Sequence, residues 1–525
     1  SREQKSGEGY IIELKALGHV TVDEVSRIKS FTKSSNDTIL SNYIEKLIKN
    51  IESGTLSILM AVILGLRKEA PLSPEDVRLL PDDAYYDKNL LSNEAQKQAV
   101  ALACMLDGIN HVAEIVQGPP GTGKTTLIKE IALQYYHRGK NVLILAKTNV
   151  AVDNILEKLI QDKVRVLRTG NNIEFKSDLP YAPLVSTSNP AYMSMLDGKN
   201  MIVLGTPLGF YLDRNMEMLN YDIVIIDEGS QMDIPETLFG LGFANKCVII
   251  GDHLQLPPFP IPNEVLLEYN PSIDLYTSEE LQKSLFEKLI TDQYRFNTVF
   301  LDINYRTENP NMVSFISDLI YDGKLYPNTD SPYYKVPKQR RNALFPQDPI
   351  EIIDTSEFLD PQTRAETEEN STYYNISEAM LSVKKVIELL EMGEKLDDIC
   401  IITPYKAQTE KLKELFHENE DYFRNTRFSL SDFIEQNIYT IDSFQGRERD
   451  NIIINWVRSN YNIPGLYTRT GFLRDYRRVN VALSRAKKRL ILIGDFVTLT
   501  RSADMKVQYI FSKIKNVNRN RKIVL

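Results

Sequence analysis

Residues 118–125 read Gly-Pro-Pro-Gly-Thr-Gly-Lys-Thr, and this stretch decides the fold. It follows the short apolar run Ala113–Val116 and opens an amphipathic segment, Thr126–Tyr136, so a strand, a glycine-rich loop and a helix come in the order of a phosphate-binding loop. Glycines let backbone N–H groups turn toward a ligand, and the positive end of the following helix attracts phosphate. The pattern predicts that the Lys124 amine reaches the β- and γ-phosphates of ATP and that the Thr125 hydroxyl holds Mg²⁺. The expected ATP contacts of the loop are Gly118, Pro119, Gly121, Thr122, Gly123, Lys124, Thr125 and Thr126.

A pair of acids supplies the second part of such a site. The apolar run Ile223–Ile226 reads as a buried strand and is followed directly by Asp227 and Glu228. Ligands of open α/β sheets bind at the carboxyl ends of the strands. We therefore expect Asp227 to act on the metal ion, directly or through its water, and Glu228 to act on the attacking water.

Short apolar runs recur in two series along the chain. Runs of four to six apolar residues without alternation are typical of strands buried on both faces of a parallel sheet. The first series comprises Asn141–Leu145, Met201–Leu204, Asp222–Ile226 and Cys247–Ile250. The second comprises Val299–Leu301, Ile350–Ile353, Ile399–Ile402, Asn437–Ile441, Ile452–Val457 and Leu490–Ile493. Helical segments such as Ile376–Met392 and Ala407–Phe416 lie between them, so the sequence predicts an α/β protein with two doubly wound parallel sheets.

Composition bounds the class of protein and its compartment. With 525 residues, 42% hydrophobic and 25% charged, the chain has the make-up of a soluble globular protein with several domains. Its 62 basic and 71 acidic residues give a net charge of −9, so any nucleic-acid site must be local. Cys104, Cys247 and Cys400 match no metal-ligand spacing, which favours a reducing, intracellular compartment, cytoplasmic or nuclear. The most apolar stretch, Thr55–Leu66, is about half the length needed to cross a bilayer, so no membrane span is expected.

The first ninety residues follow a different pattern from the rest. The apolar residues of this segment that share one face of a helix are Leu40, Tyr43, Ile44, Leu47, Ile48 and Ile51. We expect a mainly helical accessory segment, open to protein partners, on a chain that acts as a monomer. The expected division is 1–90 for this segment, 91–292 for a first domain with an insertion at about 164–199, 293–500 for a second domain with an inserted loop at about 324–348, and 501–525 for a basic tail.

Five further motifs follow the acidic pair in sequence order. They are Gly251-Asp252-His253-Leu254-Gln255-Leu256-Pro257-Pro258, Asn304-Tyr305-Arg306, Ile401-Ile402-Thr403-Pro404-Tyr405, Asp442-Ser443-Phe444-Gln445-Gly446-Arg447-Glu448 and Arg477-Arg478-Val479-Asn480-Val481-Ala482-Leu483-Ser484-Arg485-Ala486. Their wording and order resemble superfamily 1 helicases, most of all the up-frameshift-type branch, superfamily 1B. The resemblance runs from about Asn93 to Asp495 and implies two tandem RecA-like domains of the P-loop NTPase class.

The resemblance implies a role for each matching residue of the nucleotide site. Asn93 and Gln96 match the adenine-reading motif, in which an amide can pair with a donor and an acceptor of the base. Tyr305 falls where the family stacks an aromatic ring on adenine, and Glu448 where it contacts the ribose or an arginine.

Three residues are implied to link the two domains through ATP. Arg306 and Arg485 match the arginines that reach the γ-phosphate from the second domain, where a planar guanidinium suits the charge of the transition state. Gln255 corresponds to the residue that senses the γ-phosphate. Together with Lys124, Asp227 and Glu228, these residues form the expected catalytic set.

Single-stranded RNA or DNA is the implied partner, held across both domains by phosphate and sugar contacts that carry no sequence information. The matching positions are Thr148, Asn149, Thr206, Pro207, Thr403, Pro404, Tyr405 and Ser443. A further loop, with Tyr333, Tyr334, Lys335, Lys338, Arg340 and Arg341, interleaves aromatic and basic residues; it fits a nucleic-acid groove and a solvated loop equally well.

Three functions remain open at this stage. The first is an ATP-driven helicase or translocase, moving 5′ to 3′ as the family does. The second is an ATP-gated clamp or remodelling ATPase that grips nucleic acid without separating strands. The third is a P-loop kinase or metabolic NTPase, which would need neither Gln255 nor the two arginines of the second domain. Many family members also carry a small β-barrel before the adenine-reading motif, and no barrel can be found in residues 1–90.

Overall fold

The computed structural model describes residues 2–6, 9–13, 35–69, 71–73, 75–170, 200–212, 219–258, 283–291, 296–337, 348–423, 430–462 and 469–524. The chain divides into two compact units, Ser1–Thr55 and Leu56–Leu525. In the first unit, strands β1 (Arg2–Ser6) and β2 (Gly9–Glu13) form an antiparallel hairpin, and helix α2 spans Ser35–Ser53. The helix expected near residues 40–51 is thus confirmed. The hairpin is not predicted, because β1 contains no apolar residue that would indicate a strand.

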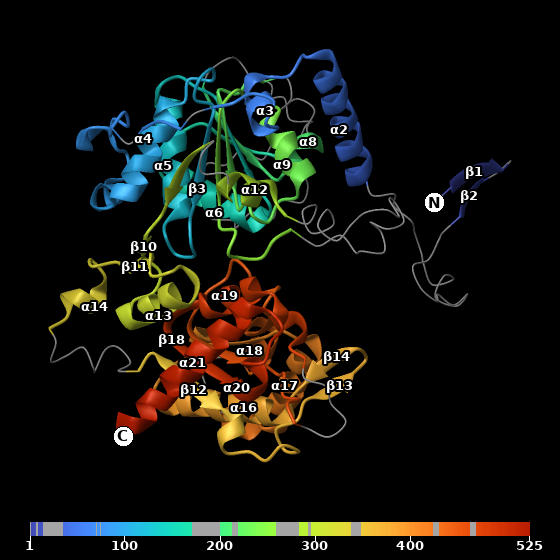
Figure 1. Ribbon diagram of the computed structural model, residues 1–525, viewed down its shortest axis with the longest axis vertical. Coiled ribbons are helices and arrows are strands. Elements are labelled where there is room, and N and C mark those ends of the chain that lie inside the picture. Colours follow the sequence, from blue (N-terminus) through green and yellow to red (C-terminus); the bar gives the residue numbers. More distant parts are fainter. Residues whose placement is uncertain are drawn as a thin grey trace. The chain divides into compact units, whose positions relative to one another are not determined.

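A seven-stranded parallel sheet forms the first domain of the second unit (Figure 1). Its strand order is β5-β6-β4-β7-β8-β3-β9. The strands are β3 (Ala113–Gln117), β4 (Val142–Ala146), β5 (Val166–Arg168), β6 (Ile202–Gly205), β7 (Ile223–Asp227), β8 (Cys247–Gly251) and β9 (Asn297–Phe300). Although β3 and β4 are consecutive in the chain, β7 and β8 lie between them. This topology places the loop after β3 beside the carboxyl ends of β7 and β8, where ligands bind in such sheets.

Helices cover both faces of this sheet, which explains why its strands are apolar without alternation. Helices α4 (Glu94–Met105), α5 (Lys124–His137) and α6 (Asn149–Ile160) share one core with every second residue of the strands, Val142 and Ile144 among them. The opposite face meets α8 (Pro207–Leu212), α9 (Ile234–Leu241) and α12 (Leu285–Thr291).

A five-stranded parallel sheet forms the second domain, in the order β12-β18-β17-β15-β16. The strands are β12 (Ile350–Asp354), β15 (Ile399–Thr403), β16 (Ile438–Thr440), β17 (Arg449–Asn455) and β18 (Ala486–Gly494). One face packs against α13 (Pro310–Ile320), α19 (Tyr476–Leu483) and α21 (Met505–Val524), and the other against α16 (Ile376–Glu391), α17 (Lys406–Glu418) and α18 (Leu430–Gln436). The predicted α/β fold with two doubly wound parallel sheets is confirmed.

Three segments lie elsewhere than the sequence analysis expects. Val299–Leu301, assigned to the second series of strands, overlaps β9, which pairs with β3 at the edge of the first sheet. Val166–Arg168, assigned to an insertion, forms edge strand β5 and pairs with β6; the rest of that insertion, 171–199, lies outside the described residues. An apolar run predicts a strand but carries no information about which sheet it joins.

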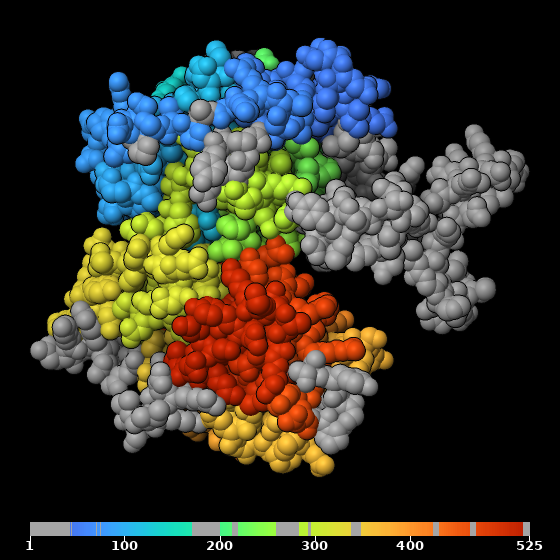
Figure 2. Space-filling model, in the orientation of Figure 1, coloured from blue at the N-terminus to red at the C-terminus, as the bar shows by residue number. Residues whose placement is uncertain are grey.

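The basic C-terminal tail is the third segment. Residues 505–524 form α21, and Val507, Ile510, Phe511 and Ile514 are buried in the core of the second domain. The C-terminal part of the chain, red in Figure 2, forms much of the surface of the second domain on the face shown. The cluster of basic residues obscured this apolar spacing, which is that of a packed helix.

Shorter elements complete the described fold. They are α3 (Ile58–Ile63), α14 (Pro332–Lys335), α20 (Phe496–Leu499), the parallel pair β10 (Ile303–Asn304) and β11 (Tyr326–Pro327), the hairpin β13 (Thr367–Glu369) and β14 (Thr372–Tyr374), and the 3-10 helices η1 (Asp82–Ala84), η2 (Lys88–Ser92), η4 (Thr355–Glu357), η5 (Leu396–Asp398), η6 (Glu420–Phe423) and η7 (Gly471–Arg474). Among the helices in the described ranges, none has the length and apolar character needed to cross a bilayer. The three cysteines form no disulfide with one another.

Candidate nucleotide site

The glycine-rich loop joins the end of β3 to the start of α5, as the sequence predicts. Gly121 and Gly123 have φ angles of +77° and +83°, a region that side chains other than glycine rarely adopt. A Cβ atom at Gly121 would lie 2.5 Å from the Cβ of Arg306, and one at Gly123 would lie 2.5 Å from Nε2 of Gln96. The Lys124 amine donates a hydrogen bond to the Gly118 carbonyl at 3.0 Å. The loop therefore needs glycine both for its backbone conformation and for its close neighbours.

Two acids stand beside the loop at the end of β7. Asp227 is 5% exposed and accepts a hydrogen bond from the backbone N–H of Glu228 at 2.9 Å. Glu228 has a φ of +52°, and its Oε1 lies 3.8 Å from the Lys124 amine. Burial, and then the neighbouring Glu228 carboxylate, raise the pKa of Asp227 to about 7. A buried carboxyl group with such a raised pKa gains most from a cation placed against it.

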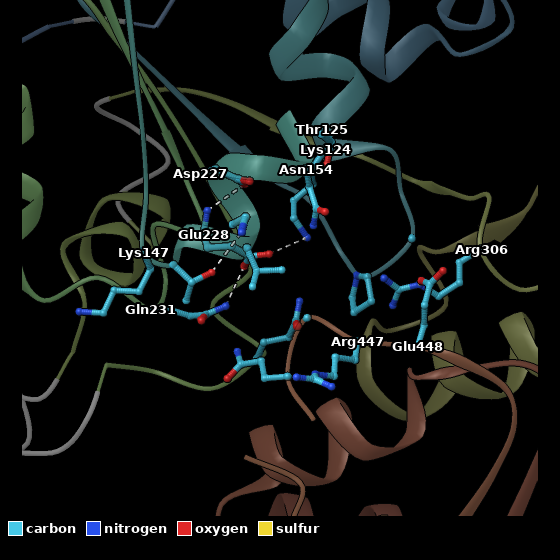
Figure 3. Close-up of a pocket in the computed structure, with 18 of the residues that line it drawn as sticks. Lys124, Thr125, Lys147, Asn154, Asp227, Glu228, Gln231, Arg306, Arg447 and Glu448 are labelled. Atoms are coloured by element: carbon cyan, nitrogen blue, oxygen red, sulfur yellow. Dashed lines mark hydrogen bonds and ion pairs between the residues drawn. The ribbon is translucent and has the colours of Figure 1, made fainter. Parts of the chain in front are cut away.

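Gln231 orients the second acid. Its Nε2 donates a hydrogen bond to Oε2 of Glu228 at 2.9 Å (Figure 3). Gln231 is not among the predicted site residues, although its position three residues after Glu228, in the turn that follows β7, is a signal that could have found it.

A cavity of about 840 Å³ opens between the two domains. In Figure 3, Lys124, Asp227 and Glu228 lie on one side of this cavity, and Arg447 and Glu448 lie on the other. The predicted site residues that line it are Gly121, Gly123, Lys124, Thr125, Thr148, Asp227, Glu228, Gln255, Arg306, Ser443, Glu448 and Arg485. The whole expected catalytic set, far apart in sequence, thus meets in one cavity.

The two arginines reach the cavity by different routes. Arg485, 3% exposed, donates from Nη2 to Oε1 of Gln255 at 2.9 Å, a bond between the second and first domains. Burial, and then the nearby cation of Arg306, lower the pKa of Arg485 to about 10, so it stays charged at neutral pH. Arg306 pairs with Glu448 and donates from Nη1 to the Ser484 carbonyl at 3.2 Å. The resemblance allowed Glu448 to contact either a ribose or an arginine, and the structure contains the arginine contact.

The three residues expected to contact adenine cluster beside the loop rather than in the cavity lining. Asn93 caps α4, and its Nδ2 donates to the Tyr305 hydroxyl at 2.9 Å. Gln96 donates from Nε2 to the Thr122 carbonyl at 2.9 Å. The backbone N–H of Tyr305 donates to the Gly121 carbonyl at 2.7 Å. These contacts bring the three residues together at Gly121 to Gly123, on the loop itself.

Of the remaining expected contacts, Thr122 bonds within the loop and Thr126 bonds a neighbouring helix. The hydroxyl of Thr122 donates to the Pro119 carbonyl at 2.7 Å, so Thr122 is buried. The Thr126 hydroxyl accepts a hydrogen bond from the Lys158 amine at 2.9 Å.

The residues expected to contact nucleic acid all lie at or just after the carboxyl ends of parallel β-strands, but their exposure differs. Thr148 and Ser443 are exposed and line the cavity. Thr403, Tyr405 and Pro207 are buried. A buried side chain cannot contact the nucleic acid without a rearrangement of the protein.

Asn149 is exposed, while Thr206 and Pro404 are half-buried. The side-chain oxygen of Asn149 accepts a hydrogen bond from Arg168 at 2.8 Å, and the Thr206 hydroxyl accepts one from the Gly209 N–H at 3.1 Å. In the aromatic and basic loop, Tyr333–Lys335 belongs to α14, while Lys338, Arg340 and Arg341 lie outside the described residues.

The cavity suits a nucleoside triphosphate chemically. Cationic side chains from both domains surround it, and the phosphate loop adds the N-terminus of α5. Thr125 and Asp227 supply the hydroxyl and carboxylate oxygens that Mg²⁺ prefers, and Mg²⁺ commonly takes one or two carboxylates plus substrate phosphates. Within the described residues, no three or more histidine, cysteine or acidic side chains cluster as a metal site would require.

Comparison with known proteins identifies families and relatives that this chain resembles. Family models described as AAA domain match residues 91–186, 186–262 and 281–496. An uncharacterized ATP-dependent helicase of Methanocaldococcus jannaschii is 29% identical, over 83% of this chain and 71% of that protein. The DNA replication ATP-dependent helicase/nuclease dna2 of Schizosaccharomyces pombe is 31% identical, over 86% of this chain and 31% of that protein. DNA-binding protein SMUBP-2 of Mesocricetus auratus is 27% identical, over 87% of this chain and 48% of that protein.

This chain spans less than half the length of the last two relatives. The matched family models nevertheless cover both sheet domains, and the motifs of the resemblance supply the residues of the shared cavity. The chain belongs to superfamily 1B of the ATP-dependent helicases.

Proposed function

We propose that this chain is a motor that uses ATP to move 5′ to 3′ along single-stranded RNA or DNA and to separate duplexes. One observation carries the proposal: Lys124, Asp227 and Glu228 of the first domain line one cavity together with Arg306 and with Arg485 of the second domain. A metabolic kinase would not need the arginines of a second domain. A triphosphate that contacts both sides favours a closed cleft, and its hydrolysis releases that closure.

Each residue of the cavity has a proposed part in hydrolysis. Lys124 binds the β- and γ-phosphates, and Thr125 and Asp227 hold Mg²⁺. When bound, Mg²⁺ neutralises charge on the phosphates. Glu228, held by Gln231 at 2.9 Å, accepts a proton from the attacking water.

The residues of the second domain act on the charge of the transition state. Arg306 and Arg485 stabilise the negative charge that spreads over the transferring phosphoryl group. Gln255 senses the γ-phosphate because it bonds Arg485 at 2.9 Å, so a ligand that moves one side chain moves the other. Glu448 holds Arg306 in the absence of the phosphate.

The adenine base is proposed to lie against Tyr305 beside the loop. The amide of Gln96 would pair with the base, with Asn93 fixing the Tyr305 hydroxyl at 2.9 Å. Gln96 would exchange its bond with the Thr122 carbonyl for one with the base.

Single-stranded nucleic acid is proposed to cross the carboxyl edges of both sheets. Thr148, Asn149, Thr206, Pro404 and Ser443 are the expected contacts with an accessible side chain. Relatives named for DNA replication and DNA binding support DNA as one substrate. A monomeric motor that acts inside the cell, with protein partners at the N-terminal segment, completes the proposal.

The rate of ATP hydrolysis tests this function. We expect uridine or thymidine homopolymers to stimulate the wild-type ATPase, and Lys124→Ala to abolish Mg-ATP binding and turnover, because the triphosphate loses its main cationic anchor. If nucleic acid does not change the wild-type ATPase rate, the chain is a metabolic NTPase and not a motor. Undiminished nucleotide affinity of folded Lys124→Ala would contradict the phosphate-loop assignment.

Duplexes with one single-stranded tail test movement and strand separation. A 5′-tailed duplex should be unwound and a 3′-tailed one should not. Unwinding that requires the 3′ tail would contradict the polarity. Stimulated ATPase without release of a strand from either duplex would identify a clamp instead.

A further inference from the structure

A second cavity, of about 640 Å³, lies within the second domain and shares no lining residue with the first. Its walls come from β14, from the residue before α17, from the segment after β17, from η7 and α19, and from the turn before α21. We call it the arginine pocket. Ligand pockets of proteins typically have volumes of about 300–1,000 Å³, so it is large enough for a nucleotide.

An exposed aromatic ring, that of Phe472, lines the arginine pocket and packs against a buried aromatic ring. Phe472 is 57% exposed, and its backbone N–H donates to the hydroxyl of buried Tyr405 at 3.3 Å. The centroid of the Tyr405 ring lies 5.6 Å from that of the Phe472 ring and 5.4 Å from that of the Tyr373 ring. Gly471 has a φ of +55°, and a Cβ there would lie 2.3 Å from the Tyr405 hydroxyl. Tyr405, expected to contact nucleic acid, instead holds Phe472 in an accessible position.

The arginine pocket is strongly basic, although the chain carries a net charge of −9. Its charged lining residues are Arg458, Arg469, Arg474, Arg478, Arg501 and Asp475. Arg458 is buried, stacks 3.9 Å over Tyr373 and is balanced by Glu366 at 2.8 Å. Arg474 and Arg501 are exposed and form no ion pair with a carboxylate in the part of the chain that the structure describes. The Arg501 guanidinium also stacks 3.7 Å over the Tyr461 ring, and two cations of the pocket thus lack a carboxylate partner among the described residues.

One ion pair joins the arginine pocket to the nucleotide cavity. Arg478 lines the pocket, and its Nε lies 3.3 Å from Oδ1 of Asp442. Asp442 lines the nucleotide cavity beside Ser443, an expected strand contact. The pocket thus borders the path proposed for the strand.

The combination of an accessible aromatic ring and unbalanced guanidinium groups suits a nucleotide, with a flat base and an anionic phosphate. We propose that the arginine pocket binds one nucleotide unit of the single-stranded substrate, its base stacked on Phe472 and its flanking phosphates at Arg474 and Arg501. The inference rests on the proposed function, because it assumes that the chain binds single strands. The same chemistry could come from a free mononucleotide, and the border with Asp442 and Ser443 favours the strand.

Binding of a fluorescent oligothymidine of about twelve nucleotides, followed by anisotropy, tests the stacking. Phe472→Ala should weaken binding about 5- to 100-fold, and Phe472→Trp should restore it, because stacking on an aromatic ring tolerates a change of ring. Phe358→Ala is the matched control, since Phe358 is 55% exposed and lies outside the pocket. Circular dichroism of each variant checks the fold.

The salt dependence of the same binding tests the phosphate contacts. Each phosphate contact to a single strand contributes about 0.7 to the slope of log affinity against log salt. The double variant Arg474→Ala/Arg501→Ala should lower that slope by about 1.4, whereas Phe472→Ala should leave it unchanged. Arg78→Ala, at an exposed arginine outside the pocket, should leave both affinity and slope unchanged.

Two outcomes would overturn the inference and leave the proposed function intact. In the first, wild type binds the oligonucleotide, and both folded Phe472→Ala and the folded arginine double variant bind it as tightly as wild type does. In the second, these variants lose affinity for thymidine monophosphate but not for the oligonucleotide, so that the pocket takes free nucleotides. A wild-type chain that binds no oligonucleotide would instead contradict the proposed function, and the inference with it.

Discussion

Arg485 carries its charge in a place where water barely reaches it. The side chain is 3% exposed, Arg306 is a second cation nearby, and burial lowers the pKa of Arg485 to about 10. Its Nη2 bonds Gln255, and no carboxylate among the described residues forms an ion pair with it. A cation held in this way is stabilised when an anion enters the cavity, and the γ-phosphate of ATP is such an anion.

The first prediction concerns this arginine. Arginine fingers contribute about 10³ to 10⁵ in rate, mainly in the transition state. Arg485→Ala should therefore keep Mg-ATP binding within roughly tenfold and lower nucleic-acid-stimulated ATPase by about a hundredfold or more. Arg485→Lys retains the positive charge but loses the planar guanidinium, so its stimulated ATPase rate should lie between those of wild type and Arg485→Ala. Near-normal turnover in a folded Arg485→Ala protein would refute the inter-domain site.

The second prediction concerns Glu228. In Glu228→Gln the amide oxygen can still accept the hydrogen bond from Gln231, but the side chain can no longer accept a proton from water. ATP binding should persist while turnover falls about 10²- to 10⁴-fold. Glu157→Gln, at another acid in the cavity lining, is the control and should retain turnover. If Glu228→Gln hydrolyses ATP within a few-fold of wild type, Glu228 is not the proton acceptor.

At the scale of single elements, the start of β3 depends on a buried acid. Glu69 is 6% exposed, and its Oε1 accepts a hydrogen bond from the backbone N–H of Val112 at 3.1 Å, one residue before β3 begins. Burial is the main reason that the pKa of Glu69 rises from 4.5 to about 7. The folded chain therefore favours the protonated carboxyl group at this position.

The third prediction follows from the sign of that pKa shift. Because the folded pKa lies above the unfolded value, the stabilisation from protonated Glu69 is complete below pH 4.5 and is lost as the pH rises through about 7. The free energy of unfolding of wild type, relative to Glu69→Gln, should fall between pH 5 and 8 by up to about 3 kcal/mol. Urea unfolding followed by circular dichroism measures this difference. A difference that is independent of pH would show that Glu69 is ionised in the folded chain.

At the scale of the whole described molecule, the two sheet domains are joined by a buried chain of hydrogen bonds. Asp252, after β8 of the first domain, accepts a hydrogen bond from the hydroxyl of Tyr321 at 2.7 Å. That hydroxyl accepts one from Nδ2 of Asn480 in α19 at 2.9 Å. Burial raises the pKa of Tyr321 well above its usual value, so its proton remains available for Asp252. Asp252 also accepts from Gln255, which connects the chain to the arginine of the cavity.

The fourth prediction tests whether this chain of bonds transmits movement. Tyr321→Phe removes the donor to Asp252 and the acceptor for Asn480 with little change of shape. The ratio of stimulated to unstimulated ATPase should fall about fivefold or more, in the usual range for coupling between sites. Tyr135→Phe is the matched control, because its hydroxyl donates at 2.7 Å to Ala103 within the first domain. Equal ratios in the two variants would assign Tyr321 a purely structural role.

Local sequence patterns determined the strands, the phosphate loop and the acidic pair. Gly121, Gly123 and Lys124 can be interpreted without tertiary structure because their backbone and side chain act within one turn of chain. The same holds for Asp227 and Glu228, since the end of an apolar run marks the end of a strand. Resemblance to a family then predicted that distant residues such as Gln255 and Arg485 meet, and the structure contains their hydrogen bond.

Only the tertiary structure decided the matters that depend on packing between distant segments. Val299 looked like a strand of the second series, but pairing with β3 put it in the first sheet. Tyr405 looked like a nucleic-acid contact, but packing against Tyr373 and Phe472 buried it and exposed Phe472 instead. A sequence motif specifies which chemical groups are present, while exposure and the choice of partner strand are set by contacts between residues far apart in the chain.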